Sequence, residues 1–290
     1  MTTPAVTVLG LGRMGQAIAG CFARGGVRVT AWNRTEPRPE NVPKGVTIAP
    51  SPSPACLASP TVVVCVSDYA AAERLLAAPA VAAALAGRTL VQLTSGTPAD
   101  ARRLASWAGL RGIEYLDGAI MSYPESIGGA KACLVYSGSL ETYERLASLL
   151  GVLGGETRFV GAAVGAAAGI DCALLEAFYG ATFALLHGAA LCASEGIGLP
   201  SYFAALKEIQ ALGPLTGDIA QAMIADGSYS GGQATLAVHV AAIENIARFA
   251  RENRVAPGIP LALLEAGKAA IAGGHRSDEI AAVFEVFRKR

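Results

Sequence analysis

Three glycines near the N-terminus have the spacing of a phosphate-binding turn. The segment Gly10-Leu11-Gly12-Arg13-Met14-Gly15 follows an apolar run, Ala5–Leu9, that predicts a strand, and it opens an amphipathic stretch that predicts a helix. Gly10 permits a tight turn, Gly12 lets the backbone approach a pyrophosphate, and Gly15 lets the helix pack close to the strand. The N–H groups at the helix start then suit the phosphates of a dinucleotide. The alternative is a glycine-rich turn that binds nothing.

The end of the second predicted strand indicates which dinucleotide fits. The strand Arg28–Trp32 is followed by Asn33-Arg34-Thr35, whereas an NAD site normally has an acid there, about 20 residues past the glycines. A carboxylate would repel a ribose 2′-phosphate. Arg34 can instead pair with it in a bidentate fork while Asn33 and Thr35 donate hydrogen bonds, and Arg38 can add a second cation. These residues predict that the cofactor is NADPH. The alternative is that Arg34 is a solvated arginine of the loop with no ligand.

One acid lies in the most apolar part of the chain. Residues 166–175 (AAAGIDCALL) contain Asp171 and no cation to compensate its charge. Buried acids are seldom left unpaired, which favours a functional group. Asp171 before CALLEAF also fits a helix N-cap, so the residues alone leave both interpretations open. Tyr179 lies eight residues further, about 80° round an ideal helix and ~12 Å along it, so one substrate could contact both side chains.

The first half of the chain has the alternation of an α/β domain. Short β-branched runs alternate with helical segments, which predicts a doubly wound, largely parallel sheet of Rossmann type. Prolines at 37, 39, 43, 50, 52 and 54 predict an irregular connection without a clear helix. We expect strands at Val6–Leu9, Arg28–Trp32, Val62–Val66, Thr89–Leu93, Glu114–Leu116, Ala132–Tyr136 and Arg158–Val160, and helices at Met14–Arg24, Ala70–Leu85 and Ala99–Ala108.

The second half has only helical patterns. We expect helices at Ala163–Ser194, Phe203–Leu212, Thr216–Ala225, Gln233–Asn253, Leu261–Ala272 and Asp278–Phe287. The chain therefore divides into a nucleotide-binding domain over residues 1–161, a long interdomain helix over 162–195 and an all-helical domain over 196–290.

Composition and charge limit the partners. Of the 290 residues, 52% are hydrophobic and only 16% are charged, so part of the surface is expected to be covered by another copy of the chain. Lys plus Arg and Asp plus Glu both number 23, which argues against nucleic acid or an anionic membrane as a partner. The N-terminus has no charged n-region or cleavage site, so we expect no signal peptide and a cytoplasmic protein.

Two further patterns support this interpretation. The apolar stretch 161–192 contains Asp171, Glu176 and His187 and is rich in Ala and Gly, which predicts a buried helix of a soluble protein rather than a membrane span. The six cysteines show no CxxC or Cys/His spacing, so we expect free thiols in a reducing compartment and no metal site.

The motifs together resemble the imine reductases and reductive aminases, which are relatives of the β-hydroxyacid dehydrogenases and share a 6-phosphogluconate dehydrogenase-like fold. DGAIM, followed by P and IG and then by LVYSG, is fairly specific to imine reductases. GLGxMG and WNRT are shared more widely. The resemblance covers nearly the whole chain and rests on GLGRMG (10–15), WNRT (32–35), LTSGTP (93–98), LDGAIMSYPESIGGAKACLVYSG (116–138), DCALLEAFYG (171–180) and IENIAR (243–248).

The resemblance implies a chemistry through two replacements. The dehydrogenases carry a catalytic Lys in a GxGxxxKxxNN pattern; threaded onto Gly165–Leu175, the pattern puts Asp171 at the Lys position and Leu174-Leu175 at the Asn pair. Their Ser-Gly-Gly substrate loop corresponds to Ile120-Met121-Ser122-Tyr123. An acid suits a substrate that becomes cationic at nitrogen. Asp171 would either stabilise an iminium as a carboxylate or donate a proton as a carboxylic acid, and both roles stay open.

The resemblance also implies the remaining site residues. Tyr179 would position the amine or relay a proton, with core packing as the alternative for both Tyr179 and His239. Ser95, Met121, Ser122, Tyr123 and His239 would contact the substrate. The residues expected to bind NADPH are Gly10, Leu11, Gly12, Arg13, Met14, Asn33, Arg34, Thr35, Val66, Ser67, Thr94 and Ser95.

Substrate and assembly follow from the same resemblance. Ser95 stands where reductive aminases commonly have Asn, and Tyr123 is bulkier than usual, so reduction of a preformed cyclic imine is favoured over amination of a ketone. The family forms intertwined homodimers through the long helix, with each site between the nucleotide domain of one chain and the helical domain of the other. Two other functions stay open: an NADP-dependent β-hydroxyacid dehydrogenase and a catalytically silent NADPH-binding scaffold.

Overall fold

The computed structural model describes residues 3–212, 217–231 and 234–288, and within them eight strands form one sheet in the order β3-β2-β1-β4-β5-β6-β7-β8. Neighbouring strands are parallel, except that β6 and β7 are antiparallel. This is the doubly wound arrangement expected from the sequence, and it confirms the predicted fold class. The strands are β1 (Ala5–Leu9), β2 (Arg28–Trp32), β3 (Val46–Ile48), β4 (Thr61–Val64), β5 (Thr89–Gln92), β6 (Glu114–Ile120), β7 (Cys133–Gly138) and β8 (Glu156–Gly161).

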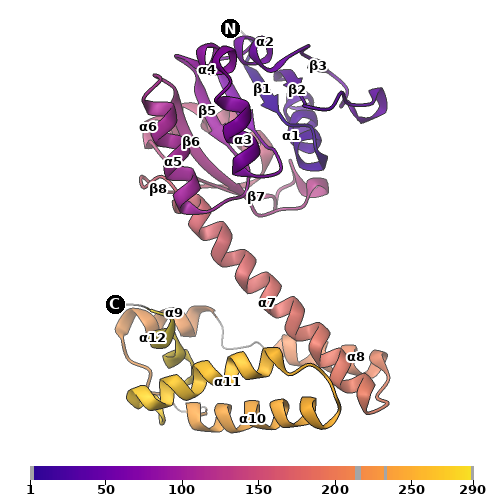
Figure 1. The fold of residues 1–290 in the computed structure, drawn as a ribbon, viewed down its shortest axis with the longest axis vertical. Coiled ribbons are helices and arrows are strands. Elements are labelled where there is room, and N and C mark those ends of the chain that lie inside the picture. Colours follow the sequence, from indigo (N-terminus) through magenta and orange to yellow (C-terminus); the bar gives the residue numbers. More distant parts are fainter. Residues whose placement is uncertain (1–2, 213–216, 232–233, 289–290) are drawn as a thin grey trace. The chain divides into compact units, whose positions relative to one another are not determined.

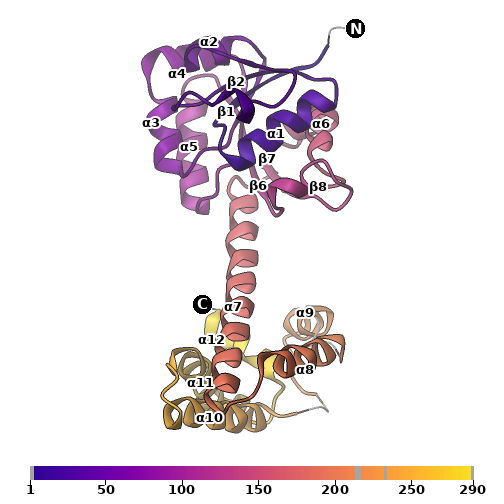
Figure 2. The same cartoon turned by 90° about the vertical axis from the view of Figure 1, so that its right-hand side faces the viewer.

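Helices cover both faces of the sheet, so its central strands β4 and β5 are buried on both sides. Val6 and Val8 of β1 pack with Phe22 on the face of α1 and α6, whereas Leu9 packs with Leu76 on the opposite face. Figure 2 shows the two helical layers on either side of the strands. The helices are α1 (Arg13–Arg24) and α6 (Leu140–Leu150) on one face, and α2 (Pro52–Leu57), α3 (Tyr69–Leu76), α4 (Pro79–Leu85) and α5 (Pro98–Gly109) on the other.

Several local expectations in this part are wrong. The proline-rich connection contains β3 and α2, because a proline at the first helical position, here Pro52, is compatible with a helix start. The single stretch expected over Ala70–Leu85 is two helices, since Pro79 begins the second. Helix α6 was not expected, although Ser139 caps it by accepting a hydrogen bond from the Thr142 N–H at 3.2 Å.

The chain forms two compact units, Met1–Ala177 and Phe178–Arg290. Helix α7 (Ala166–Ser194) begins in the first unit and continues into the second. By length and composition, α7 alone among the described helices could cross a membrane, yet only 6% of its most apolar window is buried. The expectation of a buried helix is therefore wrong for the single chain. The division into parts at residues 161 and 195 stays a prediction.

The second unit consists of helices around small apolar clusters. Helices α10 and α11 run side by side (Figure 1), and Gly267 permits this approach because a Cβ there would lie 2.7 Å from Val240 Cγ2. The segment expected as a helix over Asp278–Phe287 is a 3₁₀ turn (Ile280–Val283) followed by the short α12 (Phe284–Phe287). The expected helix starts at Thr216 and Gln233 lie outside the described residues. The other helices are α8 (Leu199–Leu212), α9 (Gly217–Asp226), α10 (Leu236–Glu252) and α11 (Gly258–Ala270).

Candidate active site

The glycine turn after β1 is open next to Gly12 and closely packed next to Gly10 and Gly15. Gly10 has φ +103°, and a Cβ there would lie 2.1 Å from the Cys65 carbonyl oxygen. A Cβ on Gly15 would lie 2.0 Å from the Gly10 carbonyl oxygen, whereas a Cβ on Gly12 would meet nothing within 4 Å. Gly12 is also the N-cap of α1, so no side chain caps the first turn of that helix. The open side therefore presents uncapped N–H groups, as a pyrophosphate requires.

Asn33 holds this turn against the end of β2. The Leu11 N–H donates to Asn33 Oδ1 at 2.9 Å, and Asn33 Nδ2 donates to the Thr35 carbonyl at 2.7 Å. The Gly10 N–H donates to the Trp32 carbonyl at 2.8 Å. The amide of Asn33 thus shapes the turn and the following loop, and Arg34 and Thr35 are left exposed beside it.

A cavity of about 560 Å³ lies over the turn, at the carboxyl ends of β1, β2 and β4. Most of the residues expected to bind the cofactor line it, but Leu11, Thr94 and Ser95 do not, and neither does Arg38. Sequence reasoning missed Ala71, Arg74 and Leu75, whose spacing puts them on one face of α3. The lining residues are Gly10, Gly12, Arg13, Met14, Gly15, Trp32, Asn33, Arg34, Thr35, Cys65, Val66, Ser67, Ala71, Arg74 and Leu75.

Asp171 is the sixth residue of α7, and only 4% of its surface is exposed. Because α7 begins at Ala166, Asp171 lies beyond the first turn, and the alternative of an N-cap is wrong. Burial raises the pKa of Asp171, and a hydrogen bond with the Ser95 hydroxyl opposes part of that rise. The neighbouring Cys172 thiol donates to the Gly96 carbonyl at 3.5 Å, so α7 contacts the loop after β5 at two adjacent residues.

The loop after β5 connects Asp171 with the cavity. Thr94 is buried, and its Oγ1 accepts a hydrogen bond at 3.1 Å from the N–H of Val66, which lines the cavity. Ser95 follows directly, and its side chain lies close enough to Asp171 to oppose part of the rise in the pKa of that carboxyl group. Since β4 and β5 are parallel, both loops leave the same edge of the sheet, where doubly wound proteins bind their ligands.

The residues after β6 lie at this edge as well. Met121 is half-buried and packs against a cluster that includes Ala119, Val135 and Ala167 of α7. The Ser122 hydroxyl accepts a hydrogen bond from the Cys133 N–H at 2.9 Å, so it holds the loop closed. Tyr123 is 63% exposed. The roles of these three residues toward a substrate stay predictions.

Tyr179 and His239 belong to the second unit. Tyr179 is 51% exposed and forms aromatic contacts with Phe178 and Phe183, at ring-centroid distances of 5.4 and 6.3 Å. His239 is half-buried on α10. Their expected roles stay predictions.

A doubly wound sheet with a phosphate-binding turn after β1 and an arginine in place of the acid after β2 is the arrangement of an NADP-dependent oxidoreductase. Comparison with known families agrees with this class. Residues 5–161 match the NAD binding domain of 6-phosphogluconate dehydrogenase, and residues 163–289 match the C-terminal domain of NADPH-dependent reductive aminase-like proteins.

Individual relatives narrow the class further. The NADPH-dependent reductive aminase of Aspergillus oryzae (strain ATCC 42149 / RIB 40) is 32% identical over 98% of this chain and 97% of its own. The imine reductase from Myxococcus stipitatus in complex with NADP+ is 35% identical with a TM-score of 0.94, over 98% of this chain and 100% of that one. The reductive aminase from Aspergillus terreus in complex with NADPH and ethyl levulinate is 36% identical with a TM-score of 0.87, over 99% and 100%.

The chain belongs to the family of NADPH-dependent imine reductases and reductive aminases. Membership confirms the enzyme class, the cofactor and the fold expected from the sequence. The open turn at Gly12 and the exposed Arg34 fit this cofactor, since they offer uncapped N–H groups and a cation where NADPH carries phosphates.

We predict opposite effects of an added methyl group at two glycines of the turn. Gly12→Ala should leave the melting temperature unchanged without cofactor, because its Cβ meets nothing within 4 Å, but should weaken NADPH binding by about tenfold or more, because the methyl group occupies the open side of the turn. Gly15→Ala should lower the melting temperature even without cofactor, because its Cβ would lie 2.0 Å from the Gly10 oxygen. Thermal melts and NADPH titrations check both. Unchanged affinity in Gly12→Ala would contradict a pyrophosphate at this turn.

We predict that Arg34→Ala weakens NADPH binding by roughly 10- to 100-fold, the range for a lost charge-assisted hydrogen bond, and NADH binding much less. Arg38→Ala is the matched control: Arg38 lies outside the cavity, so its loss should change neither affinity appreciably. Titration of each variant with both nucleotides makes the measurement. Equal losses for NADPH and NADH in Arg34→Ala would rule out a 2′-phosphate contact.

Proposed function

We propose that this chain reduces carbon–nitrogen double bonds, and the observation that carries the proposal is the buried carboxyl of Asp171 beside Ser95. NADPH supplies the hydride for the carbon. The nitrogen needs a proton, because the iminium cation is far more electrophilic than the neutral imine. A buried carboxyl group is suited to deliver that proton.

The acidic and the charged forms of Asp171 represent successive stages of one proton transfer. Burial raises its pKa and therefore favours the neutral acid in the empty site. When an imine nitrogen arrives, the acid can donate its proton and become a carboxylate paired with the new iminium. Because opposite charges attract strongly in surroundings of low dielectric constant, the pair is stabilised there. The neighbouring Ser95 side chain opposes part of the rise in the pKa of Asp171 and so favours the carboxylate form, which eases the transfer.

The substrate class we propose is small apolar imines, with preformed cyclic imines preferred. The helix residues that flank Asp171 in the sequence, 166–175 (AAAGIDCALL), carry no charge besides its own, so they offer no cation for an acidic substrate. An imine reductase from Aspergillus terreus has been solved with the cyclic compound dibenz[c,e]azepine, and a reductive aminase from the same organism with cyclohexanone and allyl amine. Ser95 is shorter than the Asn that reductive aminases commonly have there, so it would make fewer contacts with a ketone–amine adduct.

We further propose that the enzyme is an intertwined cytoplasmic homodimer in which a second copy covers α7. Leu174, Phe178, Phe183 and Leu186 of this helix are each about half exposed in the single chain. Soluble monomers rarely expose several large apolar side chains on one helix, and a bilayer does not suit a helix that contains Asp171 and Glu176. The Ala- and Gly-rich faces of α7 permit close approach of another helix. Tyr179 would then contribute its hydroxyl to a site shared between two chains.

We predict fast NADPH oxidation with 2-methyl-1-pyrroline, slower oxidation with cyclohexanone plus methylamine, and no NADP+ reduction with a 3-hydroxy acid. Absorbance of NADPH follows all three reactions. Faster oxidation of the hydroxy acid would identify a dehydrogenase, and tight NADPH binding without any turnover would identify a silent scaffold.

Asp171→Asn should lower kcat by on the order of 10² or more, since it removes a positioned acid and keeps the size and polarity of the side chain. Glu176→Gln, the same exchange at the exposed acid of α7, is the matched control and should retain kcat. In the unchanged enzyme, kcat should fall as the pH rises through the raised pKa of Asp171, because the neutral acid is the donor. Equal kcat in Asp171→Asn and Glu176→Gln would remove Asp171 from the mechanism.

We predict a particle of twice the 29.5 kDa chain mass by light scattering. Phe183→Glu should dissociate it or leave it insoluble, because the charge would lie in the centre of the covered face. Leu110→Glu, at an 86% exposed leucine after α5, is the control and should stay dimeric. A monodisperse single chain with full activity would contradict the dimer.

A further inference from the structure

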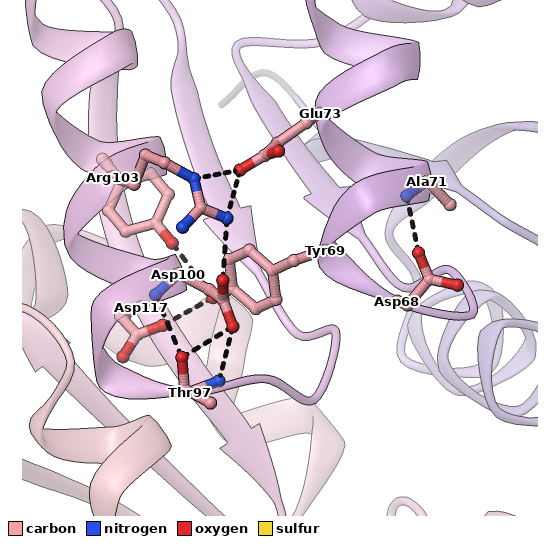
Figure 3. Close-up of polar contacts among 9 residues, drawn as sticks. Asp68, Tyr69, Ala71, Glu73, Thr97, Asp100, Arg103 and Asp117 are labelled. Carbon is pink, nitrogen blue, oxygen red and sulfur yellow. Dashed lines mark hydrogen bonds and ion pairs between the residues drawn. The ribbon is translucent and has the colours of Figure 1, made fainter.

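A second buried carboxyl group, that of Asp117, lies near the start of α7, and the proposed reaction does not use it. Asp117 is in the middle of β6 and is fully buried. Its Oδ1 accepts a hydrogen bond from the Tyr69 hydroxyl at 3.3 Å, and its Oδ2 accepts from the Ser137 hydroxyl at 3.4 Å. Figure 3 shows Tyr69 reaching from α3 toward this carboxyl group.

Asp117 and Ser137 together cap α7 from the sheet. The Ala168 N–H donates to Asp117 Oδ2 at 3.3 Å, and the Ala167 N–H donates to the Ser137 hydroxyl at 3.0 Å. These N–H groups belong to the first turn of α7, where a helix provides no carbonyl partner of its own, and a negative charge there is favourable. Asp171 follows less than one turn later on the same rigid helix. The two caps therefore fix the height and rotation at which its carboxyl group is held.

Tyr69 also supports the loop that carries Ser95. A Cβ on Gly96 would lie 2.2 Å from Tyr69 Cδ2, so the backbone next to Ser95 rests directly on the tyrosine ring. Tyr69 is itself 4% exposed. Its ring thus sets the position of the loop, and its hydroxyl sets the position of Asp117. The helix that carries Asp171 and the loop that carries Ser95 are therefore both held from one buried cluster.

We propose that Asp117 and Tyr69 are positioning residues of the reaction, which hold α7 and the loop after β5 so that Asp171 meets Ser95 and the substrate. The inference rests on the proposed role of Asp171. Neither the Asp117 side chain nor the start of α7 lines the cofactor cavity, so loosening this cluster should affect turnover more than cofactor binding.

The substitutions divide into those that keep the cluster and those that break it. Asp117→Asn keeps one oxygen for the Ala168 and Ser137 donors, and its amide group can donate to the Tyr69 oxygen, so kcat should stay within about threefold of the unchanged enzyme. Asp117→Ala should lower kcat by on the order of 10², the cost of about 1 Å of misplacement. Tyr69→Phe and Ser137→Ala each remove one link and should lose roughly tenfold. The dissociation constant of NADPH should stay within about twofold in all four.

Two controls separate positioning from loss of stability. Thr7→Val removes another buried hydrogen bond of the same unit, from Thr7 Oγ1 to the Ala55 carbonyl at 2.6 Å, and should lower the melting temperature without lowering kcat. The double variant Asp117→Ala/Asp171→Asn should be no slower than Asp171→Asn alone, because a residue that acts through Asp171 has no further effect once its acid is gone.

The outcomes distinguish the two hypotheses. If Asp171→Asn keeps its kcat, the proposed function of that residue fails whatever Asp117 does. If Asp171→Asn is slow but Asp117→Ala is not, or if the two losses multiply in the double variant, only the positioning role fails. A fall of kcat in Asp117→Asn as large as in Asp117→Ala also overturns it. Where Asp117→Ala does not fold, Tyr69→Phe and Ser137→Ala, each paired with Asp171→Asn, decide by the same criterion.

Discussion

The burial of one carboxyl group without a cation constrains the rest of this site. Removing Asp171 from water disfavours its charged form, and the Ser95 hydroxyl offsets only part of that effect. A buried acid with so little compensation destabilises the empty protein, so the fold must hold it by other means. Helix α7 is held by contacts that do not involve the Asp171 carboxyl group. These are the packing of its small residues, the hydrogen bond from the Cys172 thiol to the Gly96 carbonyl, and the capping of its first turn by side chains of the sheet.

Strand direction brings the acid and the cofactor cavity to one edge. Strands β1, β2, β4, β5 and β6 are all parallel, so the loops that follow them leave the sheet on the same side. The glycine turn, the Asn33 loop and the loop with Ser95 are therefore neighbours although they are far apart in the sequence. Strand β7 runs antiparallel to β6, and its Ser137 is paired with Asp117 in the register of the two strands. Both side chains therefore lie next to each other and accept hydrogen bonds from the first turn of α7.

The sequence predicted those features of the site whose signal lies in residues close together along the chain. The glycine turn, the Arg34 position and the isolated acid at 171 each depend on neighbouring residues, so the sequence alone indicated them. The partners of Asp171 and Asp117 could not be predicted in this way, because Ser95, Ser137 and Tyr69 reach them across long stretches of chain. Helix α6 is different. Its Ser139 cap is a local signal in the sequence, whereas the effect of Pro52 and Pro79 depends on position, because a proline either starts or interrupts a helix.

The two units differ in how much apolar surface they bury, and this difference bears on function. The first unit has a large apolar cluster on each face of its sheet, whereas the described part of the second has only small ones, such as those around Tyr229 and around Leu236. Phe178, Phe183 and Leu186 stay exposed on the same helix that carries Asp171. In the proposed homodimer, a unit with so little core would gain stability from association, and folding of the helical part and pairing of two chains would be one equilibrium. If Tyr179 acts in the reaction, the acid and this tyrosine are then assembled by the same event, and activity depends on chain concentration as stability does.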